Sequence, residues 1–275
     1  MARVWYLDRT FNLNTEYRLD KRLGMIIKLI GTNVSDEVTL YVDNKPLIPF
    51  HGDMAPINFT DDNMLGMLDL GDYYFVIPPD TPFEFKSASS GKVRVKGELW
   101  ILDPNEDLPS NAYARLREAY YKGIYYYKNT VSLGTDVAFT TTDEVILAKI
   151  EPGKLEKYLF DDILMIKVEN IDGGIDYGMI GILFKIDDQP IEFIEDNNPK
   201  RGIDIMAFPY PPNQTNGWYP FTLKQTPIEL TEGHYWEIIA VNISGSDISP
   251  VSGTSITFTV FAKMKYEKVP MALGF

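Results

Sequence analysis

One ten-residue pattern occurs twice in the chain. Residues 41–50 read YVDNKPLIPF, and residues 184–193 read FKIDDQPIEF. In both, an alternating apolar stretch is followed by two polar residues and a short segment that contains proline. Asn and Asp tolerate the positive φ angles of tight hairpin turns, and proline is accepted where an edge strand begins. The pattern predicts the same β-hairpin in two places, one for each of two related domains.

Two further matches, in the same order, support an internal duplication. Residues 23–31 (LGMIIKLIG) align with 162–170 (DILMIKVEN), with a lysine at the same place in both. Residues 89–101 (SSGKVRVKGELWI) align with 251–263 (VSGTSITFTVFAK). Repeats are sought before a fold is assigned, because each copy is a structural unit. The spacing between matches grows along the chain, which predicts longer loops in the second half.

Alternation with a period of two residues dominates the rest of the chain. It is clearest in residues 38–43, 92–102, 177–187 and 255–266, which are bounded by Gly, Asp and Ser turns. With 17 Tyr, 15 Phe and 4 Trp, the chain is rich in side chains that favour strands over helices. Short strands separated by such turns are typical of β-sandwiches and barrels.

Residues 110–123 (SNAYARLREAYYKG) form the one convincing predicted helix. Ser110 or Asn111 can cap its first turn, and Gly123 can end it. Apolar and tyrosine side chains recur on one face at helical spacing. The preceding LDPNEDLP is rich in proline and acidic residues, as linkers are. The helix is therefore expected to be a spacer that packs on one domain.

The expected fold is all-β, with two tandem antiparallel β-sandwich domains, jelly-roll-like, joined by a short α-helix. The predicted bounds are 1–104 for the N-terminal sandwich, 105–135 for the linker with its helix, and 136–275 for the C-terminal sandwich. At 275 residues the chain is long enough for each sandwich to bury a core of its own.

Charge and composition exclude several function classes. The 39 acidic residues exceed the 26 basic ones, for a net charge of −13, which repels nucleic-acid phosphates. The absence of cysteine excludes disulfides, thiolate catalysis and cysteine-bound metals. The sequence shows no apolar run of about 20 residues that could span a bilayer, nor the apolar core of a secretory signal. We expect no direct nucleic-acid binding, no membrane insertion and no export.

The sequence offers little catalytic chemistry. His51 and His234 are the only histidines, which is too few for a clustered metal site of the cupin kind. Nucleotide-binding and hydrolase motifs are absent. Acidic stretches at 59–64, 170–176 and 194–199 could suggest calcium, but tight turns explain them better. We expect no cofactor, no metal and no catalytic residues.

Paired carboxylates leave one enzymatic alternative open, because glycoside hydrolysis needs only two acids at the right separation. The candidates are Glu98 with Asp103, and a second group made of Glu192, Glu195 and Asp196. Alternation places Glu98 beside Trp100 on one sheet face. In a chain with 39 acidic residues such pairs arise by coincidence, so an enzyme is not the favoured interpretation.

The stretch 208–221 (FPYPPNQTNGWYPF) is the best candidate for ligand binding. Proline lowers the entropy cost of ordering a loop, and aromatic side chains are preferred anchors of interfaces. Stacking and hydrogen-bonding roles toward a glycan or host receptor fall on Tyr210, Asn213, Asn216, Trp218 and Tyr219. The same aromatic residues could instead close the open end of the sandwich.

The stretch 120–129 (YYKGIYYYKN) is the best candidate for a contact between subunits. Tyrosine combines a large apolar area with a hydroxyl group, which suits a partly hydrated protein interface. The residues concerned are Tyr120, Tyr121, Tyr125, Tyr126 and Tyr127. Packing of the helix against its own domain is the competing interpretation.

Two segments carry a resemblance to a known class of proteins. Residues 68–102 (LDLGDYYFVIPPDTPFEFKSASSGKVRVKGELWIL) resemble the closing strands of β-sandwich domains in virion surface proteins. Residues 143–170 (DEVILAKIEPGKLEKYLFDDILMIKVEN) resemble the opening of such a domain, with a strand, an EPGK turn and a second strand. Similar segments occur in structural proteins of tailed phages and archaeal viruses, which are often single or double jelly rolls.

The resemblance implies a structural or assembly protein of a virus particle, which would be a capsid, turret, spike or fibre component located in the virion. Its partners would be further copies of itself and other virion proteins, and the tail at 268–275 would join the tyrosine stretch in subunit contacts. The alternative is a carbohydrate- or receptor-binding β-sandwich module that uses the 208–221 stretch.

Overall fold

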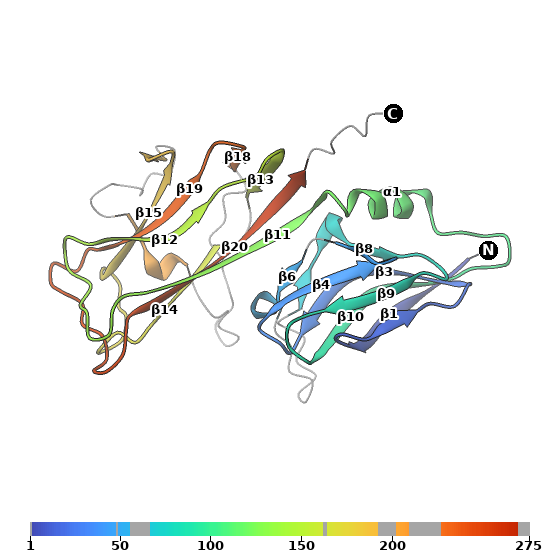
Figure 1. Cartoon of the computed structure of the whole chain (residues 1–275), viewed down its shortest axis with the longest axis horizontal. Helices are drawn as coiled ribbons and strands as arrows, with labels where there is room; N and C mark the ends of the chain where they lie inside the picture. The colour runs from blue at the N-terminus through green and yellow to red at the C-terminus, as the bar shows by residue number, and fades with distance from the viewer. Residues whose placement is uncertain are drawn as a thin grey trace. The chain divides into compact units, whose positions relative to one another are not determined.

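A computed structural model describes residues 2–47, 49–55, 67–161, 164–191, 202–208 and 227–268. The chain divides into two compact units. The N-terminal unit consists of residues 1–126 and 266–275, and the C-terminal unit of residues 127–265. Both units are built from antiparallel strands (Figure 1).

The N-terminal unit contains two sheets. The first has the order β1 (Arg3–Asn12), β10 (Lys92–Ile101), β3 (Leu23–Thr32), with β7 (Leu68–Asp69) and β8 (Phe75–Ile77) both pairing with β3. The second has the order β2 (Glu16–Arg18), β9 (Pro82–Lys86), β4 (Glu37–Val42), with β5 (Lys45–Pro46) and β6 (Phe50–His51) both pairing with β4. Two short 3-10 helices, η1 (Gly52–Met54) and η2 (Gly71–Tyr73), lie in the connections.

The C-terminal unit repeats this plan. Its first sheet contains β11 (Lys122–Ser132), β20 (Thr257–Lys268), β13 (Glu156–Phe160), β14 (Leu164–Glu169) and β18 (Ile228–Thr231). Its second contains β12 (Glu144–Ile150), β19 (Trp236–Asn242), β15 (Ile180–Ile186), β16 (Gln189–Pro190) and β17 (Ile203–Asp204), with the 3-10 helix η3 (Ile205–Ala207) after β17. The division between the units falls within β11 and β20.

Both units have the strand order of a jelly roll. Four positions in the two units are each occupied by two consecutive strands that share a position in the sheet: β5/β6, β7/β8, β13/β14 and β16/β17. When each couple counts as one strand, either unit has eight strands. Their spatial order is 1-8-3-6 in one sheet and 2-7-4-5 in the other. Eight strands in two facing sheets of this kind define the jelly roll. The all-β prediction of two tandem sandwiches with one helix is therefore confirmed.

The repeated sequence patterns occupy equivalent places in the two jelly rolls. The 23–31 pattern lies in β3, and the described part of the 162–170 pattern forms β14; these are the third strands of their units. The 89–101 and 251–263 patterns lead into β10 and β20, the last strands. The repeated hairpins connect β4 to β5 and β15 to β16. Equivalent placement of all three matches supports the internal duplication.

The two hairpin turns also share their local geometry. Both central residues have positive φ in each: 51° and 60° at Asp43 and Asn44, and 50° and 64° at Asp187 and Asp188. Positive φ at both central positions matches the right-handed twist of the flanking strands. Directly after the turns, Leu47 N donates to Leu40 O (2.8 Å) and Ile191 N donates to Phe184 O (3.1 Å).

Aromatic side chains fill both cores. In the N-terminal unit, Phe11 packs edge-on against Phe83, with ring centroids 5.2 Å apart. In the C-terminal unit, Trp236 is fully buried, and its ring lies 4.6 Å from that of Phe160.

A β-bulge interrupts the pairing of β10 with β3 at Gly97, where a Cβ atom would lie 2.0 Å from the carbonyl oxygen of Ile26. Only glycine can occupy that position without moving the neighbouring strand.

Helix α1 (Ser110–Glu118) belongs to the N-terminal unit. Together with the residues before it, it covers part of the outer face of the first sheet, where Leu108 and Ala112 pack against Ile26 and Val76. The predicted linker at 105–135 and the domain bounds of 1–104 and 136–275 stay predictions about which segments fold by themselves.

The helix begins at Ser110 as predicted, but its predicted caps and its C-terminal end were wrong. Pro109 occupies the N-cap position, and no side chain caps the first turn. Ser110 is already the first helical residue, so neither Ser110 nor Asn111 serves as a cap. The helix stops at Glu118 because β11 begins at Lys122, and Gly123 lies in that strand rather than at the helix end.

Candidate functional site

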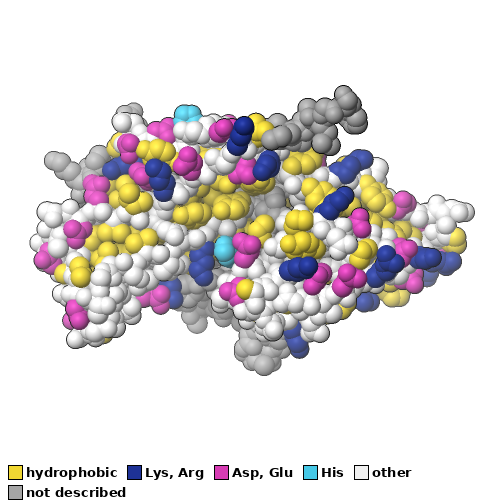
Figure 2. Space-filling model, viewed as in Figure 1, with side chains coloured by type: hydrophobic (Ala, Val, Ile, Leu, Met, Phe, Trp, Pro, Cys, Tyr) yellow, Lys and Arg dark blue, Asp and Glu magenta, His cyan; other side chains and the backbone are white. Residues whose placement is uncertain are grey.

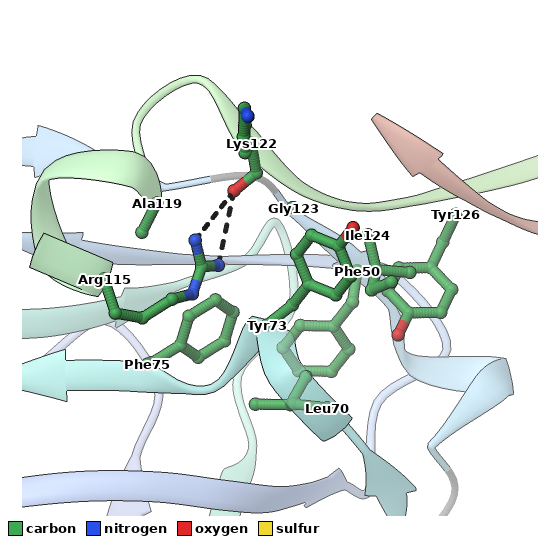
Figure 3. Close-up of a pocket in the computed structure, with 10 residues that line it drawn as sticks. All are labelled: Phe50, Leu70, Tyr73, Phe75, Arg115, Ala119, Lys122, Gly123, Ile124 and Tyr126. Carbon is green, nitrogen blue, oxygen red and sulfur yellow. Dashed lines mark hydrogen bonds between the residues drawn. The ribbon is translucent and has the colours of Figure 1, made fainter. Parts of the chain in front are cut away.

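A small hollow lies beneath α1 in the N-terminal unit (Figure 3). Its cavity volume is about 10 Å³, which is room for a single water-sized probe. Most of its walls are apolar or aromatic, and they come from Phe50, Leu70, Tyr73, Phe75, Ile124 and Tyr126. Helix α1 contributes Arg115, and Ala119 follows directly after its last turn. The start of β11 contributes Lys122 and Gly123.

Arg115 is the one buried cation of this hollow, with 6% of its surface exposed. Its Nε donates to the carbonyl oxygen of Tyr74 (3.2 Å), and both Nη atoms donate to the carbonyl oxygen of Lys122 (3.2 and 3.3 Å). The guanidinium lies 5.3 Å from the centre of the Tyr73 ring. Burial lowers the pKa of Arg115 from its ordinary value, but a guanidinium stays protonated in proteins. Arg115 thus links α1 to the segments that precede β8 and open β11.

The hollow offers no acid–base pair. Among the described residues that line it there is no carboxylate and no histidine, and its cationic groups are Arg115 and Lys122. General acid–base catalysis needs a group that exchanges a proton near the working pH. The arrangement supports packing of the helix on the sheet.

The predicted acid Glu98 is engaged in structural contacts. Lys28 Nζ and Trp100 Nε1 both donate to its carboxylate, the latter at 3.0 Å. Burial raises the pKa of Glu98, but the hydrogen bonds from Lys28 and Trp100 together lower it below its ordinary value. A carboxylate with a lowered pKa stays ionised and is a poor proton donor. Asp103 lies beyond the end of β10, where its backbone N donates to Glu106 (3.3 Å).

Several predicted residues lie outside the described part of the chain. They include the second acid group, Glu192, Glu195 and Asp196, and the acidic stretches at 59–64 and 194–199. They also include the whole binding set, Tyr210, Asn213, Asn216, Trp218 and Tyr219. The remaining acidic stretch, 170–176, forms a tight turn in which Gly173 and Gly174 have φ angles of 77° and 84°.

The five tyrosines of the predicted interface are in different surroundings. Tyr126 is buried, with 4% of its surface exposed, and Tyr120 packs against the same core. The ring of Tyr125 lies 6.3 Å from that of Tyr266. Tyr121 and Tyr127 are half-buried. Packing within the N-terminal unit accounts for Tyr120 and Tyr126, and a subunit contact through the others stays a prediction.

A polar cluster that the sequence did not indicate lies at the turns of the second sheet in the C-terminal unit. The Nδ1 atom of His234 is 2.6 Å from Asp187, and Tyr235 N donates to the same carboxylate (3.0 Å). The hydrogen bond from His234 lowers the pKa of Asp187. A hydrogen bond to Asp188 raises the pKa of the Tyr235 phenol to about 12. Pairing of β15 with β19 brings these turns together, which local sequence cannot reveal.

No group of three or more histidine or acidic side chains is arranged to hold a metal within the described residues. In the same part of the chain, no helix has the length and apolar character needed to cross a membrane.

Comparison with known proteins gives matches among solved structures alone. No protein-family model and no curated protein sequence matches the chain. A quasi-atomic model of the PBCV-1 virus capsid shares 8% identity, over 97% of this chain and 94% of its own, with a TM-score of 0.34. A structure of Sulfolobus Turreted Icosahedral Virus shares 15% identity, over 97% and 93%, with a TM-score of 0.21.

Both neighbours come from virus particles. TM-scores of this size mean that the backbones do not superpose closely, and no residue role is carried over from either neighbour.

Proposed function

We propose that the chain is a structural protein of a virus particle, as a capsid, turret, spike or fibre component, and that it acts by assembly rather than by catalysis. The observation that carries the proposal is the construction of one jelly roll twice in a single chain, with the same strand order. Jelly rolls recur in viral capsid and lectin domains. A tandem of two gives one chain several similar sheet faces and edges, which suits a repeating shell or spike.

The geometry of the described residues supports a role without catalysis. The hollow beneath α1 has no acid–base pair in its described lining, and its one buried cation donates to backbone carbonyls. Glu98 is an ion-paired carboxylate with a lowered pKa. These groups have structural duties that explain their positions without any reaction.

The proposed partners are further copies of this chain and other proteins of the virion. Closed symmetric assemblies repeat one interface around an axis, so a small number of surface residues would have large effects on assembly. The net charge of −13 disfavours direct contact with packaged nucleic acid. Tyr121, Tyr125, Tyr127 and the tail at 268–275 remain predicted contact residues.

Light scattering behind a size-exclusion column, over a hundredfold range of protein concentration, tests the proposal. We expect a defined closed oligomer, with electron microscopy showing one symmetric species. A chain that stays monomeric at every concentration, and that binds a glycan or receptor through the 208–221 stretch, would instead support the binding-module alternative.

A further inference from the structure

Four segments meet at one end of the C-terminal jelly roll. They are residues 133–143 after β11, 170–179 after β14, 203–208 around η3, and 243–256 after β19, and together we name them the loop platform. Hydrogen bonds join neighbouring segments: Gly253 N donates to Asp136 (2.6 Å), Asp172 N to Ser249 O (3.0 Å), and Gly178 N to Asp204 (2.6 Å). The platform is a connected surface rather than four independent loops.

Each of the four segments exposes one large apolar side chain. These are Val137 (50% exposed), Tyr177 (75%), Met206 (53%) and Val251 (43%). Single exposed apolar residues are ordinary, but a group of them on one surface marks an interaction site. In the described part of the chain there are eight large apolar residues with this degree of exposure, so half of them lie on the platform.

The platform is also uniformly acidic. Its segments contain six aspartates and no lysine or arginine. Four of these side chains accept hydrogen bonds from backbone N–H groups and so have a local structural role: Asp136, Asp143, Asp204 and Asp247. The exposed carboxylates of Asp172 and Asp176 accept no hydrogen bond from the described residues. They are available to a partner of opposite charge.

A surface of opposite character lies on β1 in the N-terminal unit. Val4, Trp5 and Tyr6 are 47%, 58% and 71% exposed, so this strand and the platform hold seven of the eight exposed large apolar residues of the described chain. β1 is the last strand of its sheet, and its outer edge pairs with no described strand. Exposed Arg3 and Arg9 flank the apolar run and share a strand face with Trp5, whereas Val4 and Tyr6 lie on the other face. We name residues 3–9 the β1 surface.

The β1 surface has an excess of positive charge. The one acid within it, Asp8, accepts both hydrogen bonds of a paired Arg94 (2.8 and 3.0 Å) and lies 3.3 Å from Lys96. Asp8 is therefore neutralised by β10, which leaves the charge of Arg9 on the strand, while the charge of Arg3 also acts on Asp103. Figure 2 shows basic and acidic side chains interspersed over the N-terminal unit. By sequence the C-terminal unit has 11 basic and 20 acidic residues, against 15 and 19 in the N-terminal unit.

We propose that the β1 surface of one copy of this chain binds the loop platform of a second copy. Aromatic and aliphatic side chains would cover one another at the centre, and Arg3 and Arg9 would face Asp172 and Asp176 at the rim. Because the two surfaces differ, the contact is head-to-tail and generates a ring when its rotation closes. The inference rests on the proposed assembly function and names the surfaces that it would use.

Charge reversal of one residue on each surface tests the contact. Arg9→Glu alters the β1 surface, and Asp176→Lys alters the platform. The matched control is Glu151→Lys, an equal change of charge on an exposed turn after β12, at the other end of the same unit. Light scattering of the full chain at low salt should show association weakened about tenfold by either platform or β1 reversal, and unchanged in the control.

Mixing the two variants separates a specific contact from general damage. In the mixture, the retained Arg9 of the platform variant meets the retained Asp176 of the β1 variant. At the alternate contacts the two substituted side chains meet with their charges exchanged, so the mixture should again associate, into species with an even number of copies. Misfolded variants would show no such recovery. High salt should weaken the unaltered assembly as well, because exposed charges are screened.

Three results would overturn the inference. They are a monomeric unaltered chain, association that neither reversal weakens, or a mixture that does not recover. An oligomer that resists both reversals leaves the proposed virion function standing and removes only this choice of surfaces. A monomer at all concentrations counts against both.

Discussion

Replacement of Arg115 should destabilise the N-terminal unit and leave the C-terminal unit unchanged. In Arg115→Ala, the carbonyls of Tyr74 and Lys122 lose donors that now lie 3.2 Å away. A buried acceptor left without a partner costs about 1–3 kcal/mol, and the missing side chain leaves a cavity. Release of a desolvated charge offsets part of this loss. We expect the free energy of unfolding of the N-terminal unit to fall by about 4 kcal/mol.

Hydrogen–deuterium exchange in increasing urea, read by mass spectrometry, measures the two units separately. Arg117→Ala is the matched control, because it removes an exposed arginine from the same helix and should change stability by less than about 0.5 kcal/mol. Arg115→Met keeps most of the packing without the charge and should lose clearly less than the alanine variant. The reasoning is refuted if Arg115→Ala costs no more than Arg117→Ala, or if both units lose stability equally.

Three further outcomes are expected. Hydrogen bonds from Arg94 lower the pKa of Asp8 from its ordinary value of 3.8. The ionised carboxylate therefore stabilises the fold at pH values above 3.8, and this stabilisation is lost as the pH falls below 3.8. Asp8→Asn should therefore reduce the free energy of unfolding more at about pH 7 than at about pH 3 in urea titrations, and an equal loss at both would contradict the assignment. Asn44→Val places a β-branched residue at a φ of 60° and should raise the free energy of the hairpin by about 1–2 kcal/mol, whereas Asn44→Gly should be nearly neutral in the same titration. If the binding-module alternative holds, Trp218→Ala should abolish binding in a glycan array without changing the oligomeric state, and retained binding would exclude that role for Trp218.

Features set by short-range chemistry could be predicted from the sequence. Asp43-Asn44 and Asp187-Asp188 turn as expected because Asp and Asn tolerate positive φ wherever they occur. Alternation indicated the strands of both sandwiches because it reflects which side chains face the core. The caps and the C-terminal end of the helix were mispredicted because they depend on neighbouring residues. Pro109 occupies the N-cap position, and β11 begins at Lys122, so Gly123 is part of that strand.

Features that depend on distant parts of the chain could not be predicted. Arg115 appears in the sequence as an ordinary helix residue, and its burial follows from carbonyls at positions 74 and 122. The loop platform joins segments that are far apart in the sequence, and only the jelly-roll order brings their tips together. The tyrosines of 120–129 look alike in the sequence, but Tyr126 lies on the side of β11 that packs into the core. The aromatic stretch at 208–221 is largely outside the described residues, so its role rests on sequence.

The division of the units within β11 and β20 has a topological consequence. The chain leaves the N-terminal unit after residue 126 and returns to it at residue 266, so two backbone connections join the units instead of one. The returning segment is attached by the hydrogen bond from Lys268 N to Tyr121 O (2.8 Å) and the ion pair of Glu267 with Lys122 (3.1 Å). A cut at the second connection leaves the units joined by an unbroken backbone, whereas a cut at the first leaves them joined only by the non-covalent contacts of the returning segment.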